Sequence, residues 1–210
     1  MHISQFNLYL DISYPLRRDI VKASNELKGK SKSVFRLDLD KFMHLSLYLF
    51  TTPEQSKADV LAVVEQIAKE LKPFSVMVTG ARASSDGLIM ISFEKNNHIN
   101  SIHKLAVKLL NPLRKNTLRK KYTDQEYFLK QTSTDQKLLK KYGHKYVHDN
   151  YNPHISLGFV EDDKLCKKIV VGLSERFEGK SAIVTHLKLI EDDYETSDAK
   201  EIIFSSSLTA

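Results

Sequence analysis

Two short stretches decide the fold, Met43-His44-Leu45-Ser46-Leu47-Tyr48 and Asn152-Pro153-His154-Ile155-Ser156-Leu157-Gly158. Each places His-x-Ser within a short apolar run, which predicts a strand with one buried face. Side chains at i and i+2 point to the same side of a strand, so His44 shares a face with Ser46, and His154 shares one with Ser156. The residues that alternate with them are expected to point the other way, toward helices: Leu45, Leu47, Ile155 and Leu157.

The elements expected around the two stretches follow the same order, because a strand and a helix precede each and a helix and two strands follow. Around His44 we expect strands at 3–12, 42–50, 74–78 and 88–93, with helices at 16–27 and from Thr52 onward. Around His154 we expect helices at 99–110 and 163–177 and strands at 154–160, 182–190 and 201–206. Two similar half-units are therefore predicted, at about residues 1–85 and 86–210, with residues 112–150 as an insertion in the second.

The composition is that of an ordinary soluble protein, with 41% hydrophobic and 28% charged residues. A chain of 210 residues suffices for a single domain with a substantial core. The apolar run at 3–12 is broken by Asn7 and Asp11, which favours a strand over a signal peptide, and no run approaches the roughly 20 residues that span a bilayer. The single cysteine, Cys166, excludes an internal disulfide. A cytoplasmic location without a membrane partner is the expectation.

The insertion at residues 112–150 carries the net charge of the chain. It holds ten Lys or Arg against four acidic residues, and aromatic rings alternate with the cations. This mixture suits a surface that tracks an RNA backbone and stacks bases, or else a solvated helical face whose tyrosines pack inward. The candidate RNA contacts are Arg119, Lys120, Lys121, Lys140 and Lys141.

If the two half-units pack with pseudo-twofold symmetry, their strands place two imidazoles and two hydroxyls around one cleft. This set of side chains suits chemistry on a phosphodiester. In-line displacement at phosphorus needs a proton removed from the nucleophile and another given to the leaving oxygen. Histidine, with an ordinary pKa of about 6.5, serves either purpose near neutrality. Ser46 and Ser156 would donate hydrogen bonds to the non-bridging oxygens, where negative charge accumulates. His44 and His154 are therefore the candidate catalytic residues, and this chemistry requires no metal.

Other polar residues give weaker signals. His144 and His148 are four residues apart and could share a helical face, but no third metal ligand is evident. Tyr151 lies just before the second motif, where it either stacks a substrate base or packs at the entrance of the strand. The chain has no glycine-rich phosphate loop, so neither ATP nor another cofactor is expected.

With both motifs in place, the chain resembles the two-histidine (2H) phosphoesterase superfamily, within the 2'-5' RNA ligase-like and RNA cyclic phosphodiesterase group. The repeated His-apolar-Ser-apolar signature at His44–Leu47 and His154–Leu157 carries the resemblance, which covers nearly the whole chain except the insertion. It implies an α+β fold that is bilobal, a pseudo-twofold duplication in which each lobe is an antiparallel sheet flanked by helices, with a central active-site cleft. Both motifs have serine where threonine is more frequent, and in this respect they are also similar to the motifs of the U6-processing exonuclease branch.

The resemblance implies metal-free hydrolysis of RNA 2',3'-cyclic phosphate ends to 2'-phosphates, with weak joining in a 2'-5' linkage as the reverse reaction. One alternative is a phosphodiesterase or exonuclease that acts on 2'-5'-linked, cyclic or 3'-terminal oligonucleotides. Another, of a different class, is an RNA-binding module in which the insertion does the work without catalysis. The half-units are too alike for the sequence to tell which histidine is the acid and which the base, and it leaves protein partners open.

Overall fold

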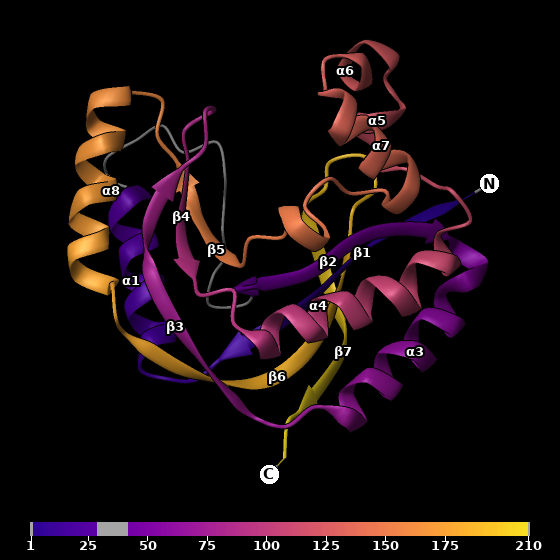
Figure 1. The fold of residues 1–210 in the computed structure, drawn as a ribbon, viewed down its shortest axis with the longest axis horizontal. Coiled ribbons are helices and arrows are strands. Elements are labelled where there is room, and N and C mark those ends of the chain that lie inside the picture. The colour runs from indigo at the N-terminus through magenta and orange to yellow at the C-terminus, as the bar shows by residue number, and fades with distance from the viewer. Residues whose placement is uncertain (1, 29–41, 210) are drawn as a thin grey trace.

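The computed structural model describes residues 2–28 and 42–209, in which helices cover the outer faces of one curved sheet (Figure 1). The strands are β1 Ile3–Ile12, β2 Leu45–Pro53, β3 Phe74–Ala83, β4 Leu88–Phe93, β5 His154–Phe159, β6 Ser181–Asp192 and β7 Ala199–Ser207. The main helices are α1 Leu16–Lys28, α3 Lys57–Glu70, α4 Asn97–Leu110 and α8 Asp163–Phe177, and a single 3-10 turn, η1 Glu54–Ser56, leads into α3. No helix in this part of the chain is long and apolar enough to cross a membrane.

The sheet divides into two lobes that share strand β6. Its strand order is β2-β1-β6-β3-β4-β5, with β7 paired to β6, and all the pairs are antiparallel. Residues 181–184 of β6 pair with β3, whereas residues 186–192 pair with β7. One lobe is therefore β2-β1-β6-β7, which we call the first lobe, and the other is β5-β4-β3, which we call the second lobe.

The chain runs twice through the same series of elements, β1-α1-β2-α3-β3 and then β4-α4-β5-α8-β6. The third strand of each series crosses into the opposite lobe, since β3 pairs with β4 and β6 pairs with β1. Helices cross as well, because α1 packs on β5 and α4 packs on β2. The pseudo-twofold α+β duplication predicted from the sequence is confirmed, and the crossing explains why the two lobes pack as one body.

Apolar alternation builds the core on the helix side of each lobe. In β1, Leu8 and Leu10 are buried against helices, as are Leu45 and Leu47 of β2. The helices contribute buried residues at helical spacing, such as Val60, Val64 and Ile67 of α3 and Ile99, Ile102 and Ala106 of α4. Burial of each large side chain stabilises the fold by roughly 1.5–3 kcal/mol. The polar residues of the strands are thereby directed to the opposite, inner face.

Two of the predicted strands, at 42–50 and 74–78, differ from the observed bounds by three or more residues at one end or both. β2 begins at Leu45 rather than Phe42, so that His44 lies immediately before the strand. β3 continues beyond Val78 to Ala83, because the register shift at Gly80, where φ is +127°, allows the strand to keep pairing with β4. This extension brings Arg82 into the second lobe.

The insertion consists of short helical segments: η2 Asn111–Arg114, α5 Lys120–Thr123, α6 Gln125–Leu129, α7 Ser133–Tyr142 and η3 His148–Asn150. It is fastened to the first lobe. Within the insertion, Arg114 is buried and holds the segments together by donating to Asn111, to the carbonyl of Lys141 and to that of Thr117. The Tyr48 hydroxyl of β2 donates to the carbonyl of Tyr142 at 2.6 Å. In Figure 1 these segments stand across from the β3–β4 hairpin.

Candidate active site

Both His-x-Ser motifs have the alternation that a strand with one buried face requires. Leu45 and Leu47 are at most 1% exposed, and Ile155 and Leu157 at most 2%. The histidines and serines between them are only partly buried: His44, Ser46, His154 and Ser156. Each histidine therefore lies on the inner face together with its serine.

The two histidines form the same hydrogen bond. Nδ1 of His44 donates to the carbonyl of Phe42 at 2.7 Å, and Nδ1 of His154 donates to the carbonyl of Asn152 at 2.7 Å. A carbonyl oxygen can only accept, so Nδ1 carries the proton in each ring, and Nε2 of the neutral ring is an acceptor. Both rings thus keep Nε2 for proton transfer while Nδ1 holds their orientation.

Burial lowers the pKa of both histidines. For His44 the hydrogen bond to Phe42 opposes part of this effect on the pKa. For His154 burial is again the largest cause of the lowered pKa, and the charges of Arg82 and His44 lower it further. The neutral form, which is able to accept a proton, is favoured at each position. The effect of His44 on the pKa of His154 also indicates that the two imidazoles lie within electrostatic range of each other.

Tertiary contacts bring the two motifs together from opposite ends of the strand order. β2 and β5 contact each other because the sheet curves back on itself (Figure 1). The Tyr151 hydroxyl, just ahead of β5, donates to the carbonyl of Ser46 at 3.0 Å. His103 of α4 donates from Nδ1 to the carbonyl of Leu47 at 2.7 Å, and its Nε2 accepts from the backbone N–H of His148 at 2.9 Å. These bonds tie β2 to the segment that leads into β5.

Tyr151 has a packing position rather than the base-stacking position considered from the sequence. Its ring is 5% exposed, and one face is stacked on His103 with centroids 3.9 Å apart and planes at 2°. A substrate base therefore has no open ring face to stack on at Tyr151. The residue instead holds the Ser46 carbonyl.

The serine hydroxyls are available to a ligand. In the part of the chain that the structure describes, neither Ser46 Oγ nor Ser156 Oγ has a hydrogen-bond partner, although both lie on the face of the histidines. Two hydroxyl donors next to two imidazoles match the needs of a phosphate whose non-bridging oxygens gain charge. Across residues 2–28 and 42–209, no group of three or more His, Cys, Asp and Glu side chains is placed to hold a metal ion.

The five cations singled out in the insertion fall into three settings. Arg119 donates to Gln5 at 3.2 Å and to Ser197 at 3.1 Å, which anchors the insertion to the first lobe. Lys120 is paired with Glu195 at 3.0 Å. The side chain of Lys121 is exposed as a whole, but partial desolvation of its ammonium group, with the charges of Arg119 and Lys145, lowers its pKa to about 8. Lys140 and Lys141 are also exposed, and their ammonium groups lie over rings of the insertion itself, 5.6 Å from Phe128 and 5.1 Å from Tyr142.

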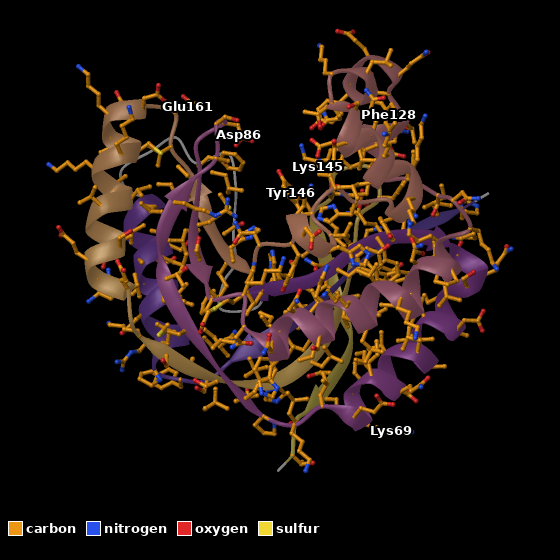
Figure 2. All side chains as sticks on the ribbon, in the orientation of Figure 1. Lys69, Asp86, Phe128, Lys145, Tyr146 and Glu161 are labelled. Atoms are coloured by element: carbon orange, nitrogen blue, oxygen red, sulfur yellow. The ribbon has the colours of Figure 1, made fainter. Side chains whose placement is uncertain are left out.

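One part of the insertion reaches the histidines. Burial lowers the pKa of His144 well below its ordinary value, and the charges of Arg119, Lys121, His103 and His154 lower it further. His144 therefore lies among the cations of the insertion and near His154. Its ring packs edge-on against Tyr146, with centroids 5.5 Å apart. Figure 2 shows Lys145 and Tyr146 on the side of the insertion that faces the hairpin carrying Asp86.

Sequence analysis missed three residues that contribute to the site. Tyr9 of β1 is opposite Ser46, and its ring meets that of His44 edge-on with centroids 6.2 Å apart. His103 of α4 contributes through its hydrogen bond to the carbonyl of Leu47. Arg82 lies beyond the predicted end of its strand. Alternation continued from Val76 and Val78 predicts the buried face for Arg82, so its place on the inner face depends on the register shift at Gly80 and has no signal in the sequence.

A curved pseudo-twofold sheet with one histidine and one serine from each half defines a two-histidine phosphoesterase. The chain belongs to the 2'-5' RNA ligase superfamily, whose family profile matches residues 38–195. A search of curated protein sequences gives no match.

Solved structures share the fold at low sequence identity. The protein TT0787 of Thermus thermophilus is 14% identical with a TM-score of 0.62, and the match covers 97% of each chain. LigT of E. coli in complex with 3'-AMP is 10% identical with a TM-score of 0.57, and the match covers 100% of each chain.

Proposed function

We propose that this protein is a metal-independent phosphodiesterase that opens RNA 2',3'-cyclic phosphate ends to 2'-phosphates, with His44 and His154 as general acid and base. The matched tautomer of the two rings is the observation that carries this proposal. Each Nδ1 is occupied by a carbonyl two residues back in the chain, so each Nε2 is an acceptor in the neutral ring and a donor in the charged ring. An acid and a base of this kind are what in-line displacement at phosphorus requires.

In the proposed reaction, the neutral histidine takes a proton from water through Nε2 while the water oxygen attacks phosphorus. The bond between phosphorus and the ribose 3' oxygen breaks, and the other histidine, in its protonated form, gives its proton to that oxygen. A 2'-phosphate and a free 3'-hydroxyl remain. Either ring can serve as the base, because both have the same Nδ1–H tautomer.

The serines stabilise the charge that develops during this step. Ser46 and Ser156 lie two residues after the histidines on the same face and have no hydrogen-bond partner in the described residues, so their hydroxyls can donate to the two non-bridging oxygens. Loss of one such donor typically costs a factor of about 100–1,000 in kcat.

Nucleotides as the substrate class are supported by two features. In the insertion, Lys121 lies within electrostatic range of Arg119, and His144 lies within electrostatic range of His154. Positive side chains at this border attract the phosphates of an RNA strand. In addition, LigT, which has the same fold, binds 3'-AMP, a ribonucleotide with its phosphate on the ribose.

The test is turnover of a short RNA that ends in a 2',3'-cyclic phosphate, with EDTA present. We expect ring opening to a 2'-phosphate by the wild-type protein, and a loss of roughly 100-fold or more in His44→Ala and in His154→Ala. His98→Ala is the matched control, because His98 is an exposed histidine of α4.

Each failure has its own meaning. No turnover by the wild-type protein would reject this substrate, and 2'-5'-linked and cyclic oligonucleotides would be assayed next. RNA binding that survives both histidine substitutions, without turnover of any of these substrates, would establish a binding module instead of an enzyme.

A further inference from the structure

The two lobes present corresponding positions on their inner faces. In the first lobe, Ser46 of β2 is opposite Tyr9 of β1, which is opposite Lys188 of β6. In the second lobe, Ser156 of β5 is opposite Met90 of β4, which is opposite Arg82 of β3. Residues opposite one another in antiparallel strands share a face. Lys188 and Arg82 are therefore equivalent cations, each two strands away from its catalytic serine.

The cation of the first lobe is neutralised. Lys188 Nζ lies 2.6 Å from Asp11 Oδ2, and Asp11, two residues after Tyr9, is only 8% exposed in its side chain. Asp11 also pairs with Arg17. A buried carboxylate with two cationic partners leaves Lys188 committed to the fold.

The cation of the second lobe is not neutralised. The position equivalent to Asp11, two residues after Met90, is occupied by Ser92, which has no charge. Arg82 donates from Nε to Ser92 Oγ at 3.2 Å. In the part of the chain that the structure describes, Arg82 forms no ion pair, and its two terminal nitrogens have no hydrogen-bond partner.

The hydrogen bond to Ser92 directs the guanidinium toward the histidine. Ser92 is directly opposite His154 in the β4–β5 pair, and side chains at such positions begin roughly 5 Å apart. The charge of Arg82 contributes to the lowered pKa of His154, which agrees with this position. On its other side, Arg82 is within electrostatic range of Tyr146. The free end of the guanidinium therefore lies on the inner face, between His154 and the insertion.

We infer that Arg82 is a third substrate-binding side chain of this site and that it binds the non-bridging oxygens of the reacting phosphate beside His154. The inference rests on the proposed function and adds to it a fixed positive charge that only the second lobe supplies. A guanidinium with two free terminal nitrogens can form a bidentate hydrogen-bonded contact with phosphate, which the ammonium of Lys188 does not provide. Charge on these oxygens rises during displacement, so the contact strengthens in the transition state.

The experiment compares Arg82→Met, which keeps an unbranched apolar stem and removes the charge, with Arg82→Lys and the control Arg18→Met. Arg18 lies on α1 with 60% of its side chain exposed. With the cyclic phosphate RNA, we expect kcat/KM to fall about 100-fold in Arg82→Met and to recover partly in Arg82→Lys. We expect no change in Arg18→Met. Thermal unfolding midpoints should be equal among the four proteins, which excludes loss of the fold as the cause.

Active wild-type protein with Arg82→Met within threefold of it would overturn the inference and leave the proposed function standing. Inactive wild-type protein would reject the proposed function, and Arg82 is then tested by binding alone. In that case the measurement is calorimetric titration with adenosine 2'-monophosphate. Affinity at least 10-fold weaker in Arg82→Met than in Arg18→Met supports an anion-binding Arg82, and equal affinity overturns it.

Discussion

His103 gives a test of how the two motifs are held together. The imidazole is fully buried, donates to the carbonyl of Leu47 and accepts from the backbone N–H of His148. A neutral ring satisfies both partners, whereas a charged ring would have no acceptor nitrogen for His148. Burial accordingly lowers the pKa of His103 to about 4, with the charges of His148, Lys95 and Lys104 adding to the effect.

The sign and size of the pH effect follow from this pKa. The unfolded chain has an ordinary histidine pKa of about 6.5, so between pH 6.5 and 4 the unfolded state binds more protons than the folded state. The contribution of neutral His103 to the free energy of unfolding is complete above pH 6.5 and is lost as the pH falls from 6.5 to 4. At pH 5 the difference amounts to about 2 kcal/mol of unfolding free energy.

The assay is urea unfolding of wild type, His103→Gln and His98→Gln at pH 7.5 and pH 5.0. We expect His103→Gln to be less stable at pH 7.5, because each backbone group left without its partner costs about 1–3 kcal/mol. Its further loss on going to pH 5.0 should be about 2 kcal/mol smaller than that of wild type. The lowered pKa values of His44, His144, His148 and His154 act in the same direction in all three proteins, so the comparison isolates the change at position 103.

His98 is exposed on the same helix, so His98→Gln should match the wild-type pH dependence. An equal loss in His103→Gln and wild type would refute a buried neutral His103. A loss that is also smaller in His98→Gln would show that the effect does not belong to this position.

Two further predictions concern the site. Removing the Tyr151 hydroxyl in Tyr151→Phe deletes the hydrogen bond to the Ser46 carbonyl and should lower stability by about 1 kcal/mol, measured by urea unfolding, with unchanged stability speaking against this link. Lys121→Ala should reduce the slope of log affinity for single-stranded RNA against log salt by about 0.7, whereas Lys120→Ala should change it less, because Lys120 is paired with Glu195. Equal slopes in wild type and Lys121→Ala would show that Lys121 does not contact the RNA phosphates.

Local patterns in the sequence predict the order of the main strands and helices and their repetition. Strand β1 and helix α8 have the bounds that alternation and helical spacing predict, although β1 is buried on both faces and α8 on one. The same local rule placed each histidine on one face with its serine. The same rule predicted too early an end for β3, because a glycine within a strand resembles a strand end until the partner strand is known.

The meeting of the two motifs in one site depends on contacts between distant segments. Strands β2 and β5, which carry the two motifs, lie at opposite ends of the sheet order, and their contact depends on the curvature of the sheet and on bonds from Tyr151 and His103 that span many residues of sequence. The difference between the lobes is likewise invisible in the linear chain. Among the residues that the structure describes, a lysine neutralised by Asp11 and an arginine bonded only to Ser92 become comparable once strand register places them in equivalent positions. Register depends on pairing between distant segments, which local patterns do not contain.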